Sequence, residues 1–268
     1  TGSRNVAIGY QALLQLNYNG EGYNVAVGSN AGENVSSGVQ NTLIGGLAGD
    51  ALNTGNFNVA IGYQTLSTED AGNYNTAIGY KALSVQDAGD AYNTAVGFQA
   101  GTAVTSGIQN TLMGALAGDS LTTGTNNVAI GFEAGKTMTT TTNNLLIGYQ
   151  AGYLMLDNTK NVCIGSTTGG FLGSHLADEN VFIGNGAGAS GEWDQPDDNT
   201  ANQNVGIGVT VMGGAGSNTQ DPHFTAADNV AIGFESLKLI TTGANNVVVG
   251  SGAGDTITTG HSNVAIGF

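Results

Sequence analysis

The sequence has few charged residues, little proline and one cysteine, and each shortage excludes a class of protein. Charged residues make up 9% of the 268, against about a quarter in ordinary globular domains, so ion pairs contribute little to stability. Two prolines beside 45 glycines exclude a collagen-like or proline-rich disordered chain. The one cysteine, Cys163, excludes an intramolecular disulfide framework. We interpret it as a small buried hydrophobic residue.

Positive charge is also scarce. Five Lys and Arg stand against twenty Asp and Glu, which gives a net charge of −15. Nucleic acids and anionic membranes both bind cationic surfaces, so we expect neither as a partner. No apolar run reaches the roughly 18 residues of a membrane span, which predicts no membrane insertion. The chain begins without Met and inside a repeat, which indicates a processed or excised segment.

One short sequence motif is abundant. Asn, three mostly apolar residues and Gly occur in this order fifteen times, from Asn5–Gly9 to Asn263–Gly267. A fixed period of about 17 residues is typical of a solenoid, in which small equal turns, here called rungs, are stacked. We predict that the asparagine amides form a structural ladder, each bonding its copies or capping a corner. These residues are Asn5, Asn24, Asn41, Asn58, Asn75, Asn93, Asn110, Asn127, Asn144, Asn161, Asn180, Asn204, Asn229, Asn246 and Asn263.

The residues that follow each repeat Asn alternate in size. Val, Thr or Leu comes first and Ile, Val or Met comes third, with mostly Ala between them. This predicts a short strand with one β-branched face and one small face. A second apolar column, with Val35, Leu52 and Met138 among its members, lies six residues before many asparagines and predicts a second short strand. We expect the two strands to face each other across a thin core that buries about two aliphatic side chains per rung.

The expected fold class is therefore all-β, a parallel β-solenoid (β-roll) of about fifteen rungs of ~17 residues. Residues 1–268 are expected to form a single repeat solenoid. Residues 35–55 nearly recur at 104–124, which indicates growth by duplication of four rungs. The period breaks twice, and this predicts insertion loops within 185–203 and 209–228.

These two insertion loops are the candidate functional site, because loops on a rigid scaffold often carry recognition. They hold the only Trp, both prolines and a group of carboxylates. A Trp ring can stack on a sugar, and carboxylates are Ca²⁺ ligands, although the spacing fits no EF-hand loop and no other cofactor or metal site is indicated. The alternative is a tolerated surface insertion. The candidate receptor-binding residues are Trp193, Asp194, Asp197, Asp198, His223 and Phe224.

Two further columns leave alternatives open. Aromatic residues five positions after the Asn, such as Tyr63, Tyr80 and Phe98, fit either a sugar-binding track or packing against adjacent rungs or sister chains. A column of hydroxyl residues that includes Thr105 and Thr122 keeps an ice-binding solenoid as an alternative.

The sequence carries no recognisable catalytic motif. It has no G-x-S-x-G, no H-E-x-x-H, no phosphate-binding loop and no Cys/His metal pattern. We expect no catalytic residues and no enzyme activity. A polysaccharide depolymerase remains an alternative, because the acidic loops contain enough carboxylates for the pair that glycoside hydrolysis requires.

Two segments carry a family resemblance. The units N-x-A-I-G-Y-x-A-L at 75–83 and N-x-A-I-G-F-x-A-G at 127–135 resemble repeats of phage and bacterial tail-fibre-type proteins. The N-x-A-I-G core resembles, more distantly, the head repeats of trimeric autotransporter adhesins, whose units are shorter. The resemblance implies an extracellular homotrimeric fibre, on a virion tail or a bacterial cell surface, that binds a cell-surface glycan or protein receptor.

We therefore expect a structural and adhesive fibre segment, similar to a tail-fibre shaft, whose insertion loops present the receptor site. A bacterial surface adhesin or extracellular matrix filament is the nearest alternative. The endosialidase-type chaperone domain that often ends tail-fibre chains has no counterpart in these 268 residues.

Overall fold

The computed structural model describes residues 2–170, 177–189, 201–213 and 225–268. They form an all-β parallel β-solenoid with fifteen strands of three residues each, about 17 residues apart, as the repeat predicts. The chain divides into two compact units, Thr1–Asn127 and Val128–Phe268, which are described separately. Among the described residues, no helix is long and apolar enough to cross a membrane.

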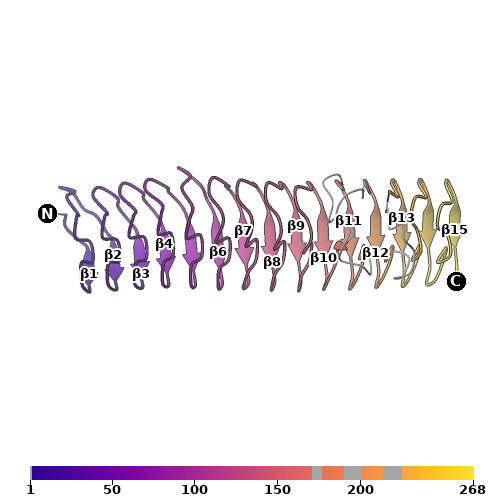
Figure 1. Cartoon of the computed structure of the whole chain (residues 1–268), viewed down its shortest axis with the longest axis horizontal. Coiled ribbons are helices and arrows are strands. Elements are labelled where there is room, and N and C mark those ends of the chain that lie inside the picture. Colours follow the sequence, from indigo (N-terminus) through magenta and orange to yellow (C-terminus); the bar gives the residue numbers. More distant parts are fainter. Residues whose placement is uncertain (1, 171–176, 190–200, 214–224) are drawn as a thin grey trace. The chain divides into compact units, whose positions relative to one another are not determined.

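The first unit contains seven strands that pair in chain order (Figure 1). Each strand aligns residue by residue with the next, so that Val59 lies beside Thr76 and Ile61 beside Ile78. The strands are β1 (Val6–Ile8), β2 (Val25–Val27), β3 (Thr42–Ile44), β4 (Val59–Ile61), β5 (Thr76–Ile78), β6 (Thr94–Val96) and β7 (Thr111–Met113).

The second unit contains eight strands with the same parallel register. The two long insertions do not disturb it, because Val181 pairs with Val205 and Val205 with Val230 across them. The strands are β8 (Val128–Ile130), β9 (Leu145–Ile147), β10 (Val162–Ile164), β11 (Val181–Ile183), β12 (Val205–Ile207), β13 (Val230–Ile232), β14 (Val247–Val249) and β15 (Val264–Ile266).

The repeat asparagines hold adjacent rungs together, because within each unit the backbone N–H of one repeat Asn donates to Oδ1 of the repeat Asn before it. The Asn58 backbone N–H donates to Oδ1 of Asn41 at 2.9 Å, and Oδ1 of Asn58 accepts from the Asn75 N–H at 2.9 Å. The Asn58 Nδ2 also donates to Oδ1 of Asn41 at 3.2 Å and to the Gly72 carbonyl at 2.7 Å, so this side chain connects its own rung to both neighbours. Because these amides are buried, a residue without them would leave backbone groups unsatisfied, at a cost of about 1–3 kcal/mol.

The Gly that ends each repeat motif is required for two reasons: its backbone conformation, and the lack of room for a Cβ atom. Gly62 has φ +135°, and a Cβ there would lie 2.1 Å from the carbonyl oxygen of Gly79 on the next rung. L-residues rarely adopt this φ, and the next rung leaves no room for a methyl group. The same close approach recurs along both units.

The strand face that points inward is the small one. Ala60 and Ala77, the middle residues of β4 and β5, are completely buried, whereas the flanking Val59 and Ile61 stay partly exposed. The β-branched strand residues therefore do not enter the core, whereas the expected burial of about two aliphatic side chains holds in rungs such as that of β3, where Leu43 and Leu52 are completely buried. The core takes the middle strand residue, most often Ala, together with side chains from the returning segment.

The expected second strand is also absent from the described residues. The returning segment, which carries the second apolar column back toward the next repeat Asn, forms turns instead. One example is the hydrogen bond from the Val35 N–H to the Gly32 carbonyl at 3.1 Å. Gly32 has φ +59°, and such left-handed residues break the alternation that a strand requires. The second apolar column still enters the core as predicted. Its completely buried members are Val35, Leu52, Val104, Leu121, Met138, Met155 and Ile240.

Candidate functional site

The sequence-predicted receptor site lies outside the described residues. Trp193, Asp194, Asp197 and Asp198 fall within 190–200, and His223 and Phe224 fall within 214–224. The described residues directly before these two segments, Ala189 and Gly213, each lie nine positions after a repeat Asn.

The clearest surface feature is the outward face of the strands, here called the strand face. It consists of the first and third residue of each strand, which are Val, Thr, Leu, Ile or Met in every case. Most of these residues are partly exposed, and Ile44, Met113 and Ile232 are more than a third exposed. The face carries no charged side chain, although the chain has a net charge of −15.

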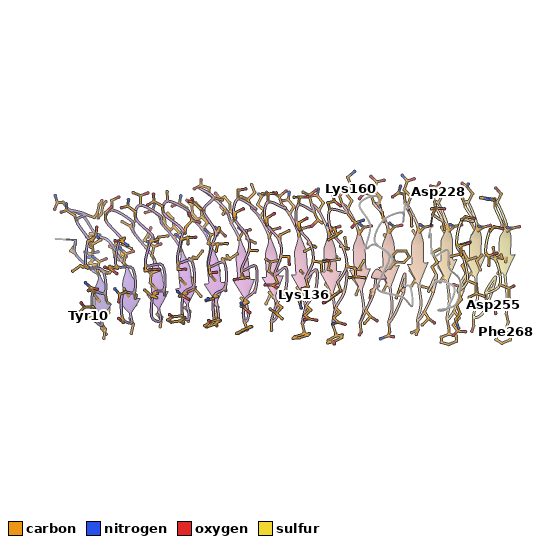
Figure 2. All side chains as sticks on the ribbon, in the orientation of Figure 1. Tyr10, Lys136, Lys160, Asp228, Asp255 and Phe268 are labelled. Atoms are coloured by element: carbon orange, nitrogen blue, oxygen red, sulfur yellow. The ribbon has the colours of Figure 1, made fainter. Side chains whose placement is uncertain are left out.

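Two exposed edges border the strand face. The leading edge consists of the residues directly before each repeat Asn, and the trailing edge consists of the residues five positions after it. Figure 2 shows Tyr10 at the trailing edge of the first unit. In the second unit it shows Lys160 and Asp228 on the leading edge and Phe268 at the opposite end of the strands.

Aromatic side chains stack along both edges of the first unit. On the leading edge, the ring centroids of Phe57 and Tyr74 are 5.1 Å apart and those of Tyr74 and Tyr92 are 4.9 Å apart, with nearly parallel planes. On the trailing edge, Tyr63, Tyr80 and Phe98 stack at 5.9 and 5.3 Å. The sequence pattern indicated the trailing column. The leading column was missed, although its position directly before the Asn would have revealed it.

The aromatic residues of the leading edge are held in an unusual backbone conformation. Phe57, Tyr74 and Tyr92 have φ of 59°, 61° and 52°, a region in which bulky side chains are uncommon. Asn or Gly fits such a corner at lower cost, and Asn126 and Asn143 occupy it in other rungs. The same position is left-handed before every repeat Asn, for example at Gln109 (φ 59°) and Lys160 (φ 59°), so this corner conformation belongs to the fold and is not specific to the aromatic residues.

A buried polar cluster interrupts the core beside these same rungs. Glu69 is completely buried, and its carboxylate accepts hydrogen bonds from Gly72 N–H at 2.7 Å and Gln86 Nε2 at 2.9 Å. Gln86 Oε1 in turn accepts from Asn93 Nδ2 at 2.9 Å. Burial raises the pKa of Glu69 above its usual value, and the bonds from Gln86 and the backbone oppose this shift.

Next to this cluster, the Asn75 side-chain nitrogen is buried without a hydrogen-bond partner. The interval from Asn75 to Asn93 has one residue more than the usual 17. Gly89 takes the place that Gly72 has in the preceding rung, but its carbonyl accepts a hydrogen bond from the Asn73 N–H and not from the Asn75 side chain. The cluster is a polar defect of the core, and sequence reasoning did not identify it.

The cationic side chains are dispersed along the chain. Ion pairs join Arg4 to Glu21, Lys136 to Glu133, Lys160 to Glu179 and Lys238 to Glu235. The remaining cation, Lys81, lies with its Nζ 5.5 Å from the Tyr80 ring centroid. Ion pairs on an exposed surface contribute little to stability, and the five cationic side chains form no patch.

The hydroxyl column serves the backbone in several rungs. Thr139 Oγ1 donates to the Leu156 carbonyl at 3.0 Å, and Thr241 Oγ1 donates to the Thr258 carbonyl at 3.1 Å. A hydroxyl engaged in this way is not available as a free donor to ordered water, which weakens the case for an ice-binding array.

No group of three or more His, Cys, Asp or Glu residues that could hold a metal occurs in the described part of the chain. The acidic loop residues considered as Ca²⁺ ligands lie outside that part. Cys163 is completely buried, and burial raises its pKa to about 12, so the thiol stays protonated and unreactive at neutral pH.

Comparison of the chain with protein-family models, with curated proteins and with solved structures finds no match.

Proposed function

We propose that this chain is a structural and adhesive fibre segment, a tail-fibre-like shaft that assembles extracellularly with copies of itself as a homotrimer. The observation that carries the proposal is the charge-free, partly exposed strand face, which recurs on rung after rung in both units. Apolar surface that repeats in this way gains free energy when a second surface removes it from water.

The charge distribution supports association through this face. Copies with a net charge of −15 repel each other, so they approach most easily where no charge lies. The strand face has no charged residue on any strand of either unit. Val, Thr and Ile columns present a regular pleated surface that packs well against another sheet of the same kind.

Under this proposal the insertion loops present the receptor site. Both loops belong to adjacent rungs in the sequence, and a rotationally symmetric oligomer displays each loop once per copy. The ligand is a cell-surface glycan or protein. On a glycan array, a Trp193→Ala variant is expected to lose signal relative to the parent chain, and equal binding by both proteins would refute the loop assignment.

Light scattering under native conditions tests the assembly. We expect a mass near three times 26.8 kDa. The double variant Ile61→Lys and Ile78→Lys places charge on the strand face and is expected to give single chains of unchanged β-sheet circular dichroism. The matched control, Thr54→Lys with Ala71→Lys, adds the same charge at exposed positions of nearby rungs outside the strand face and is expected to keep the oligomer. A parent chain that remains monomeric at high concentration would overturn the proposal.

A further inference from the structure

We infer that neighbouring copies join edge to edge in the same register, with the leading-edge rings Phe57, Tyr74 and Tyr92 of one copy packed against the trailing-edge rings Tyr63, Tyr80 and Phe98 of the next. This inference rests on the proposed self-association and specifies its geometry. The partner is a second copy of this chain.

The two aromatic stacks belong to the same three rungs. Phe57 and Tyr63 flank β4, Tyr74 and Tyr80 flank β5, and Tyr92 and Phe98 flank β6. On the adjacent β3 and β7, neither edge is aromatic, because the flanking residues are Gln40 and Gly46, and Gln109 and Ala115. Large apolar side chains therefore occur together on both edges in one block of the first unit.

Copies related by rotation about an axis parallel to the solenoid bring these two edges together. Such a head-to-tail contact joins different surfaces of the two copies and closes into a ring. It places equal rungs at equal height, so each leading-edge ring meets the trailing-edge ring of the same rung. A shift by one rung leaves one ring of each stack opposite a rung without an aromatic residue, so the full aromatic contact specifies one register.

The exposed parts of the rings suit another protein edge better than a sugar. Tyr74 and Tyr80 have both ring faces covered by the rings of adjacent rungs. Sugar stacking requires an open ring face, which Tyr74 and Tyr80 in the middle of the two stacks lack, while the six side chains keep 41 to 51% of their surface exposed. Aromatic edges pack favourably against other aromatic side chains.

The local charges agree with this contact. No charged residue occupies either edge or the strand face on β4, β5 or β6, and the one cation beside these rings, Lys81, lies with its Nζ 5.5 Å from the Tyr80 ring centroid.

Disulfide cross-linking between copies tests the arrangement. Two variants are prepared, Tyr74→Cys and Tyr80→Cys, and their equimolar mixture is refolded together and oxidised mildly. Each variant carries one introduced cysteine, so the introduced thiols can only link two different chains. The native Cys163 is buried and does not take part.

We expect covalent dimers in the mixture and at least tenfold fewer in either variant alone. Tyr74→Cys mixed with Ala115→Cys, which lies on the trailing edge two strands further along, is the register control and is expected to give little product. Strong cross-linking by Tyr74→Cys alone indicates a two-fold contact between like edges and overturns the inference. Equal yields with Tyr80→Cys and Ala115→Cys overturn the register.

A second measurement separates this inference from the proposed function. Tyr74→Ala with Tyr80→Ala is expected to weaken the oligomer at least tenfold by sedimentation. Phe132→Ala with Tyr149→Ala, which removes two rings whose rungs have Asn126 and Asn143 on the leading edge, is expected to weaken it far less. A monomeric parent chain refutes both proposals. An intact oligomer that shows neither the cross-link nor the selective weakening refutes the edge contact and leaves the fibre proposal standing.

Discussion

At the residue scale, one glycine per rung decides whether rungs can stack. Replacement of Gly62 by Ala forces a Cβ to within 2.1 Å of the Gly79 carbonyl oxygen at φ +135°. We expect the free energy of unfolding to fall by more than about 2 kcal/mol, because strain and steric clash add. The measurement is the urea midpoint.

Gly89 is the matched control for this change. A Cβ at Gly89 meets nothing within 4 Å, and its φ lies outside the left-handed range. Gly89→Ala should change stability by about 0.5 kcal/mol or less. Equal losses in the two variants would contradict the close-approach argument.

The buried Glu69 makes stability depend on pH. Burial raises the pKa of this carboxyl above its usual 4.5, so the folded state favours the protonated form. Its contribution to the free energy of unfolding is therefore complete below about pH 4.5 and is lost as the pH rises through the folded-state pKa. The stability of the parent chain relative to Glu69→Leu should decline over this window.

Glu179 provides a contrast with the opposite sign. The hydrogen bond from Lys160 lowers the pKa of Glu179, so its contribution is present above the unfolded pKa and is lost as the pH falls. The parent chain relative to Glu179→Gln should therefore lose stability toward low pH, and only slightly because this pair is exposed. A flat pH profile for the Glu69 comparison would show that its environment does not penalise the charge.

At the scale of the strand, packing between adjacent rungs is specific. Phe182 occupies the middle position of β11, where Ala is usual, and it is completely buried. The middle residue of β12 is Gly206, and a Cβ there would lie 2.9 Å from the Phe182 ring. The two residues therefore form a large–small pair.

A double-mutant cycle tests this pair. Phe182→Ala should cost about 3–5 kcal/mol through the cavity that it leaves, and Gly206→Ala about 1–3 kcal/mol through overpacking. The double variant restores the usual Ala–Ala arrangement and should lose less than the sum, as measured by chemical denaturation. Additive losses would contradict the proposed pairing.

Strand position and register could be predicted from the sequence, because every strand lies within a copy of the same repeat motif. The returning segment could not. Its apolar residues mark burial, but left-handed residues such as Gly32 and Gly49 set the path, and alternation in the sequence does not reveal them. The polar cluster around Glu69 and Gln86 was missed because each residue, read alone, is typical of a surface corner.

At the scale of the molecule, the solenoid should tolerate removal of whole rungs. Residues 35–103 comprise β3 to β6 and lie between two nearly identical junctions, before Val35 and before Val104. Because each rung packs only on its neighbours, we expect a chain lacking these 69 residues to fold with a similar circular dichroism spectrum per residue. It should also associate more weakly, since it lacks both aromatic stacks.

The control is a deletion out of phase, of residues 35–95. It joins segments from different positions of the rung and moves side chains to the wrong face, so we expect aggregation or loss of cooperative unfolding. Equal folding of the two deletions would contradict the assignment of rung boundaries.

The sequence by itself determined the period, the parallel strands, the ladder of repeat asparagines and the glycine that permits close stacking, because each follows from one residue type at a fixed interval. Only the tertiary structure decided which strand face points inward. Alternation defines two faces but does not say which is enclosed, and that choice depends on the left-handed corners and on the volume that the returning segment occupies. As a result the β-branched face lies outside, bordered by the aromatic edges, and becomes the surface on which assembly is proposed.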